Sequence, residues 1–150
     1  MKKIYTLVLF VFASLVSSAQ CTELFFSEYA EGSSNNKYLE IYNPSNSAID
    51  LSDYSIFQTY GTGSSQFNTF DLTGMLQPNE VYIIATDQAS TDITSEADTL
   101  LSFPSVVHFN GDDAVALLKG TDTIDAIGIL FQRTVWTVGT GNTRNHTLIR

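Results

Sequence analysis

Short runs in which apolar and polar residues alternate recur along most of this chain. In the run 37–42, Leu39 and Ile41 would point to one face of a strand, while Tyr38, Glu40 and Tyr42 would point to the other. A period of two residues is typical of a half-buried β-strand. Similar apolar or alternating runs are found at 24–30, 48–51, 54–60, 67–72, 81–85, 106–109, 114–119, 123–129, 134–138 and 147–149.

Turn residues separate these runs at regular intervals. Asn110-Gly111 stands between 106–109 and 114–119, and this dipeptide favours a type I′ turn, which predicts a hairpin there. Gly120-Thr121-Asp122 predicts a second turn, and the segment 87–98 has helical spacing for at most one turn of helix. Many short strands with almost no helix predict an all-β, antiparallel β-sandwich.

The predicted core of this sandwich consists of the inward apolar positions of its strands. These are Leu39, Ile41, Leu51, Ile56, Val81, Ile83, Val115, Leu117, Ile124 and Ala126.

The first 19 residues have the pattern of a secretory signal peptide. A basic start at Lys2 and Lys3 precedes an apolar run over 4–16, and small residues at 17–19 predict cleavage after Ala19. Cys21 raises the alternative of a lipoprotein, but Gln20 does not suit a lipidation site. We therefore expect a secreted protein, extracellular or periplasmic, with a signal peptide at 1–19 and one domain at 23–150.

Composition narrows the classes of function that remain. The chain of 150 residues has 16 acidic and 7 basic residues, and loss of Lys2 and Lys3 lowers its formal net charge from −9 to −11. Such a surface repels phosphate backbones, so we expect no direct binding to nucleic acids. A single cysteine excludes a disulfide framework or a thiolate zinc cluster, so the fold depends on a hydrophobic core. No membrane-spanning segment is expected in the mature chain.

Several of these segments, taken in order, resemble the lamin tail domain of the bacterial, secreted type. The resemblance covers about 23–150, and Asp53 and Asn79 stand where glycine is common in that family. The segments that carry the resemblance are Phe26–Tyr29, Tyr38–Pro44, Ile49–Ser52, Leu76–Ala85, Gly111–Leu118, Ile124–Gly128 and His146–Arg150. The resemblance implies an immunoglobulin-like sandwich that does not catalyse a reaction itself. It also implies an interaction or accessory module, often joined to secreted nucleases, phosphatases or other extracellular enzymes.

Four carboxylates, Glu28, Asp112, Asp113 and Asp125, are candidate ligands for calcium. Hard cations prefer clustered oxygen ligands, and Asp125 lies inside an otherwise apolar strand where an unpaired charge is costly. Alternatively, these carboxylates accept hydrogen bonds from amides of the loops. The second interpretation is favoured because the fixed ligand spacing of a calcium loop is absent. No other cofactor is expected.

No residue is predicted to be catalytic. Asp112 and Asp113 are neighbours, and neighbours along a strand point to opposite faces. His108 and His146 belong to no recognised serine motif, and we expect the His108 ring to lie at the surface of a strand or to be hydrogen-bonded.

Aromatic residues allow a further interpretation. Tyr38, Tyr42, Tyr54, Tyr60 and Trp136 could form a stacking platform for a glycan, or they could fill the core and pair across strands. The packing interpretation is favoured, since tyrosines are commonly half-buried on sheets.

Three functions remain open. The first is a secreted, non-catalytic module that mediates protein or cell-surface interactions, as an accessory domain of a larger extracellular protein. The second is the N-terminal part of a secreted nuclease or phosphatase. The third is a surface domain that binds calcium or a glycan.

Overall fold

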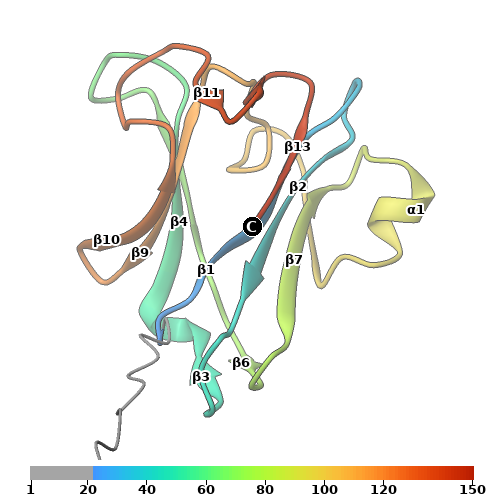
Figure 1. Ribbon diagram of the computed structural model, residues 1–150, viewed down its shortest axis with the longest axis vertical. Helices are drawn as coiled ribbons and strands as arrows, with labels where there is room; N and C mark the ends of the chain where they lie inside the picture. Colours follow the sequence, from blue (N-terminus) through green and yellow to red (C-terminus); the bar gives the residue numbers. More distant parts are fainter. Residues whose placement is uncertain (1–21) are drawn as a thin grey trace, which may run out of the picture.

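Two β-sheets face each other in the computed structural model, which describes residues 22–150 (Figure 1). One sheet has five strands in the order β13-β1-β2-β7-β8. Its members are β1 (Phe25–Glu31), β2 (Lys37–Tyr42), β7 (Val81–Thr86), β8 (Thr99–Leu101) and β13 (Thr147–Ile149). The other has four strands in the order β10-β9-β4-β5. Its members are β4 (Tyr54–Thr59), β5 (Phe67–Asp71), β9 (Ala114–Lys119) and β10 (Asp122–Ile127).

Smaller elements close the ends of the sandwich. β3 (Ile49–Asp50) pairs with β6 (Met75–Leu76), and β11 (Thr137–Val138) pairs with β12 (Gly141–Asn142). A 3₁₀ turn, η1 (Leu51–Asp53), leads into β4, and the one-turn helix α1 (Thr91–Thr94) lies outside the five-stranded sheet (Figure 1). Within residues 22–150, no helix is long and apolar enough to cross a membrane.

The sheet pairings confirm the predicted all-β, immunoglobulin-like antiparallel sandwich. Every paired strand within residues 22–150 is antiparallel to its neighbour except β8, which runs parallel to β7. The strand predicted at 37–42 is β2, and the turn predicted at Gly120 joins β9 to β10. The predicted single helical turn in 87–98 is α1.

The core lies between the two sheets and contains most of the predicted residues. Leu39 and Ile41 of β2 are fully buried, as are Ile56 of β4 and Val115 and Leu117 of β9. Leu51 in η1 is also buried. Burial of these side chains supplies most of the stabilisation available to a domain without a disulfide.

The predicted core positions on β7 are wrong. Leu39 pairs with Ile84, so Ile84 shares the inward face of Leu39, while Val81 and Ile83 point outward. Val81 is 37% exposed, and Ile83 is half-buried. The run is apolar on both faces, so its pattern does not indicate which face is inside.

The two predicted core residues on β10 are also less buried than expected. Ile124 is half-buried and packs against the rim of the core, and Ala126 is half-buried opposite Ala116. β10 is an edge strand of its sheet, so one side of it is not covered by a neighbouring strand.

The predicted hairpin at Asn110-Gly111 is not formed. Residues 106–109 are an irregular loop whose Val106, Val107 and Phe109 are fully buried. The Phe109 ring stacks on the Tyr29 ring at 4.5 Å, so these apolar residues contact the opposite sheet instead of forming a strand. The signal peptide predicted at 1–19 and the Cys21 prediction lie outside the described residues.

Candidate functional site

A pocket of about 450 Å³ lies at the end of the sandwich where β4 ends and β5 begins. β4 and the residue after it provide Gln58 and Tyr60, and β5 provides Asn68. The loop between β8 and β9 and the segment after β10 provide the remaining wall. The wall residues are Phe103, Pro104, His108, Asn110, Asp113 and Arg133.

Two buried polar atoms of this pocket have no hydrogen-bond partner. The Gln58 side chain is fully buried, and its Oε1 accepts a hydrogen bond from Asn68 Nδ2 at 2.7 Å while its Nε2 has none. Asp113 is 1% exposed, and its Oδ2 accepts a hydrogen bond from the Asn110 amide at 2.8 Å while its Oδ1 has none. An unsatisfied buried polar group costs about 1–3 kcal/mol, so these two atoms reduce the stability of the fold.

The alternation of β4 explains why these side chains share the pocket. Tyr54, Ile56 and Gln58 are buried at every second position, so Gln58 occupies the next inward position after two core residues. Gln58 pairs with Val115 of β9, and Asp113 precedes Val115 by two residues. Both polar side chains therefore extend from the same face of the four-stranded sheet.

The charge of Asp113 is poorly solvated. Burial raises the pKa of its carboxyl above the usual range, although the hydrogen bond from the Asn110 amide acts in the opposite direction. Arg133 Nε lies 4.0 Å from Asp113 Oδ1 but donates its hydrogen bond to Asp112 Oδ2 at 2.8 Å. Asp112 therefore holds Arg133 at the edge of the pocket, and Asp113 Oδ1 stays without a hydrogen-bond donor.

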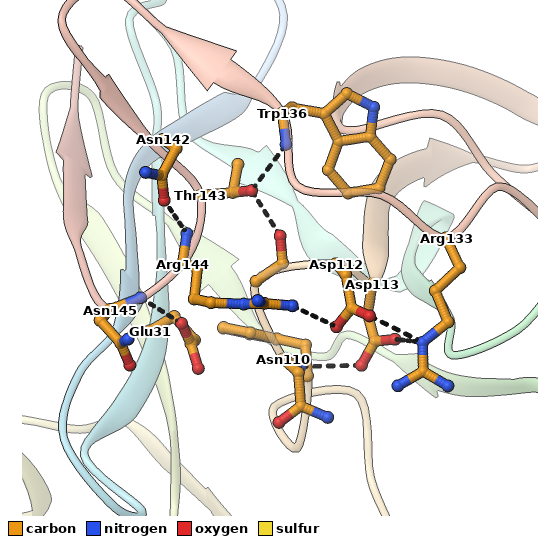
Figure 2. A network of polar contacts seen from close by, with 12 residues as sticks. Glu31, Asn110, Asp112, Asp113, Arg133, Trp136, Asn142, Thr143, Arg144 and Asn145 are labelled. Carbon is orange, nitrogen blue, oxygen red and sulfur yellow. Dashed lines mark hydrogen bonds and ion pairs between the residues drawn. The ribbon is translucent and has the colours of Figure 1, made fainter.

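The C-terminal segment fixes the turn 110–113 that carries these carboxylates (Figure 2). Thr143 Oγ1 donates to the Gly111 carbonyl and accepts from the Trp136 amide at 3.1 Å. Arg144 lies against the same turn, since its Nη2 is 3.8 Å from Asp112 Oδ1. A Cβ at Gly111 would come within 2.3 Å of the Arg144 Cα, so this close approach requires glycine.

A buried ion pair anchors the loop before β9 to the five-stranded sheet. Lys37 Nζ lies 3.2 Å from Glu31 Oε1 and donates to the Phe109 carbonyl at 2.6 Å. Glu31 in turn accepts a hydrogen bond from the Asn145 amide. Both side chains are about nine-tenths buried, so the pair connects β1 and β2 to the loop and to the C-terminal segment.

His108 lies in the part of the pocket wall that the loop between β8 and β9 forms, and two hydrogen bonds fix its ring. Its Nε2 is 3.1 Å from Thr86 Oγ1, and its Nδ1 is 2.8 Å from Ser105 Oγ. Burial lowers the pKa of the ring, so the imidazole is neutral at pH 7. The sequence predicts a ring that lies on a strand or is hydrogen-bonded; it is hydrogen-bonded, but it lies in a loop.

Ser105 and His108 do not form a catalytic arrangement. The second ring nitrogen of His108 faces the Thr86 hydroxyl, whereas an activated serine needs a base that a carboxylate orients. His146 Nδ1 lies 2.6 Å from the Arg144 carbonyl, where it helps to shape the C-terminal turn.

The four calcium candidates do not come together. Asp112 and Asp113 share the turn 110–113, while Glu28 accepts a hydrogen bond from the Tyr38 hydroxyl at 2.6 Å elsewhere. Asp125 Oδ2 accepts hydrogen bonds from the Phe26 amide and from Arg150 Nη1, each at 2.8 Å. Of these donors, the Asn110 amide that bonds to Asp113 is the loop amide that the hydrogen-bonding interpretation expects, whereas Glu28 and Asp125 accept from a hydroxyl, a strand amide and an arginine. In the part of the chain that the structure describes, no three His, Cys, Asp or Glu side chains are placed to hold a metal ion.

The five aromatic candidates are also scattered. Tyr54 is buried, Tyr42 packs edge-on against Phe25, and the Trp136 ring covers Gly128. Of the five, only Tyr60 lines the large pocket, where it is 39% exposed. The sequence pattern does not identify six residues of the pocket as site residues: Gln58, Asn68, Phe103, Pro104, Asn110 and Arg133. The sequence does contain one indication of the pocket, because Gln58 is a polar amide at an inward position of an alternating strand.

The comparisons with known proteins agree with this architecture. The model of the Lamin Tail Domain family matches residues 17–130, which is more than half of the chain. No curated protein matches the chain. The family is one of non-catalytic, immunoglobulin-like domains, in agreement with the two facing sheets. The chain therefore belongs to the lamin tail domain family.

Proposed function

We propose that this protein is a secreted, non-catalytic module that binds a partner at the cell surface or outside the cell. The signal-peptide pattern at 1–19 supports secretion. The observation that carries the binding function is the open pocket with Gln58 Nε2 and Asp113 Oδ1 unpartnered. Both atoms are covered by neighbouring protein atoms, so their side chains must turn toward the pocket; a ligand that then satisfies them would recover free energy that the folded protein gives up without it.

The chemistry of the pocket suits binding better than catalysis. Among the described residues, Asp113 is the one carboxylate in the pocket wall, and His108 is held neutral between two hydroxyls. General acid–base catalysis by carboxylates needs two groups whose pKa values differ, and the described wall places no second carboxylate opposite Asp113.

We further propose that the module serves as an accessory domain of a larger extracellular protein or assembly. A module that only binds raises the effective concentration of whatever is attached to it, without any new contact. Modest affinity at one pocket is sufficient for such a role.

The test compares surface binding with turnover. Fluorescently labelled protein starting at Gln20 is mixed with envelopes of the cells that produce it, and binding isotherms are measured. Phe103→Ala removes an exposed ring at the mouth of the pocket, and Ile149→Ala removes an equally exposed side chain on β13 as a control.

We expect saturable binding that weakens in Phe103→Ala and persists in Ile149→Ala. A panel of nuclease, phosphatase, esterase and glycosidase substrates should show no turnover. Absence of saturable binding, or turnover that is lost in Asp113→Asn, would overturn the proposed function.

A further inference from the structure

The polar floor and the aromatic mouth of the pocket select one class of ligand. We propose that the pocket lined by Gln58, Asp113 and Phe103 binds a neutral sugar residue of a glycan. This inference rests on the proposed binding function and specifies its ligand.

A hydroxyl group matches the chemistry of the two unpartnered atoms, which are covered by protein atoms and become accessible to a ligand when their side chains turn toward the pocket. Gln58 Nε2 offers a hydrogen-bond donor and Asp113 Oδ1 offers an acceptor. A hydroxyl accepts from the first and donates to the second, whereas an ammonium can only donate and a carboxylate or phosphate can only accept. Two adjacent hydroxyls of one sugar ring could also share this task, one accepting from Gln58 Nε2 and the other donating to Asp113 Oδ1.

The charges and hydrogen-bonding groups around the pocket disfavour ionic ligands. An anion would approach the buried Asp113 carboxylate in a protein whose formal net charge is −9. A cation would be attracted by the net charge, but it would meet the Arg133 guanidinium at the edge of the pocket and could not accept the hydrogen bond of Gln58 Nε2. A neutral ligand that carries hydroxyl groups avoids both penalties.

The mouth of the pocket offers apolar surface for the ring of a sugar. Phe103 is 71% exposed, and its ring meets the His108 ring edge-on with 5.2 Å between centroids. His108 is itself fixed by Ser105 and Thr86, so the Phe103 ring rests against a rigid support. Tyr60 presents a second partly exposed ring. Aromatic faces contact the C–H groups of a pyranose favourably while its hydroxyls reach polar partners.

The size of the pocket and its other polar groups agree with this ligand. A volume of about 450 Å³ lies within the range of roughly 300–1,000 Å³ for small-ligand sites. Asn68 and Asn110 add side-chain amides to the wall. Asn68 Nδ2 already donates to Gln58 Oε1 and to the Ser105 carbonyl, so Asn68 offers its oxygen as an acceptor, while the Asn110 amide group offers a donor, and the hydroxyls of a sugar can use both.

The test is a titration followed by nuclear magnetic resonance. Labelled protein starting at Gln20 is titrated with neutral mono- and tetrasaccharides of glucose, mannose, galactose and N-acetylglucosamine. Tetragalacturonate serves as an anionic probe and chitosan tetrasaccharide as a cationic probe. The side-chain amide signals of Gln58, Asn68 and Asn110 report directly on the pocket.

We expect at least one neutral saccharide to shift these three amide signals in a saturable manner. Asp113→Asn should bind at least about tenfold more weakly, because a hydrogen bond to a charged acceptor is lost. Phe103→Ala, a surface change that leaves the floor intact, should bind about three- to tenfold more weakly. Asp122→Asn on the far hairpin and Ile149→Ala on β13 should bind like the natural protein.

The outcome separates this inference from the proposed function. If envelopes bind through the pocket but no neutral saccharide shifts the Gln58 signal, the sugar assignment is wrong and the binding function stands. Shifts by the anionic or the cationic probe alone would also overturn the sugar assignment. If neither envelopes nor saccharides bind, both proposals fail.

Discussion

Replacing Asp113 by Asn should make this protein more stable. The side chain is buried, and its Oδ1 has no hydrogen-bond partner in the natural protein. Asparagine keeps an oxygen that accepts from the Asn110 amide, while a neutral amide is less costly to bury than a carboxylate. The substitution therefore removes a charge from the interior and preserves the local turn.

The size of the gain follows from two opposing contributions. The amide nitrogen of Asn would take the place of Oδ1 and would also lack a partner, so the gain is only the amount by which an unsatisfied charged group costs more than the about 1–3 kcal/mol of a neutral one. Against this, the substitution removes the attraction between Asp113 and Arg133, which acts over 4.0 Å on a half-exposed side chain. Such pairs contribute about 0–1 kcal/mol. We expect a net gain of about 1 kcal/mol. For a domain of this size, that corresponds to a rise in Tm of about 3–5 °C.

The dependence of this gain on pH gives a second check. Burial raises the folded-state pKa of Asp113 above its ordinary value of 3.8, so between the two values the native state binds more protons than the unfolded state. The contribution of Asp113 to stability therefore falls as the pH rises through this window. The difference in Tm between Asp113→Asn and the natural protein should be near zero below pH 3.8 and largest at neutral pH.

Differential scanning calorimetry of both proteins between about pH 3 and pH 8 measures this difference. Asp122→Asn, an exposed substitution on the β9–β10 hairpin, is the control for a general change in net charge. A lower Tm for Asp113→Asn at pH 7 would show that the carboxylate stabilises the fold. A gain that does not change with pH would refute the assignment to its charge.

Further predictions test the core, the buried ion pair, a turn and metal dependence. Leu117→Ala should cost about 2–5 kcal/mol in urea unfolding, because the fully buried side chain leaves a cavity; an unchanged midpoint would contradict the core assignment. Lys37→Met should cost about 3–5 kcal/mol by leaving Glu31 charged and buried, and adding Glu31→Gln should restore most of the loss. Gly128→Ala should cost about 1–3 kcal/mol and change the Trp136 fluorescence, since φ is +85° and a Cβ would come within 2.6 Å of the ring. EDTA should leave Tm unchanged, because the candidate carboxylates do not converge; a drop of several degrees would support a calcium site.

Alternation along the chain predicts where most strands lie, but not always which face is buried. In β2 the polar Glu40 separates Leu39 from Ile41, so the inward positions can be identified, although Lys37 also lies on the inward face, where it pairs with Glu31. In β7 the apolar run covers both faces, and only the pairing of Leu39 with Ile84 reveals the inward one. β8 is three residues long and pairs in parallel, which no local pattern indicates.

The loop before β9 shows why a local turn signal can mislead. Asn110-Gly111 suits a hairpin, but the residues before it gain more by burial against Tyr29 than by pairing with β9. The Asp113 side chain then binds the Asn110 amide and closes a different turn. Long-range burial overrides the short-range preference in this loop.

The candidate site can be predicted from the sequence only in part. Asp113 is a candidate because of its charge, and Tyr60 because of its ring. Their neighbours Asn68, Phe103 and Arg133 come from three separate segments, so only the folded arrangement brings them together. Asp125 shows the same limit, since its amide partner on Phe26 lies 99 residues away.

The most direct test of the role of Asp113 measures binding and stability on the same variant. We propose that Asp113 serves binding at a cost in stability. Labelled Asp113→Asn protein should therefore bind envelopes of the producing cells at least about tenfold more weakly at pH 7, while its Tm is equal to or above that of the natural protein. Unchanged envelope binding by this stable variant would show that Asp113 does not serve binding.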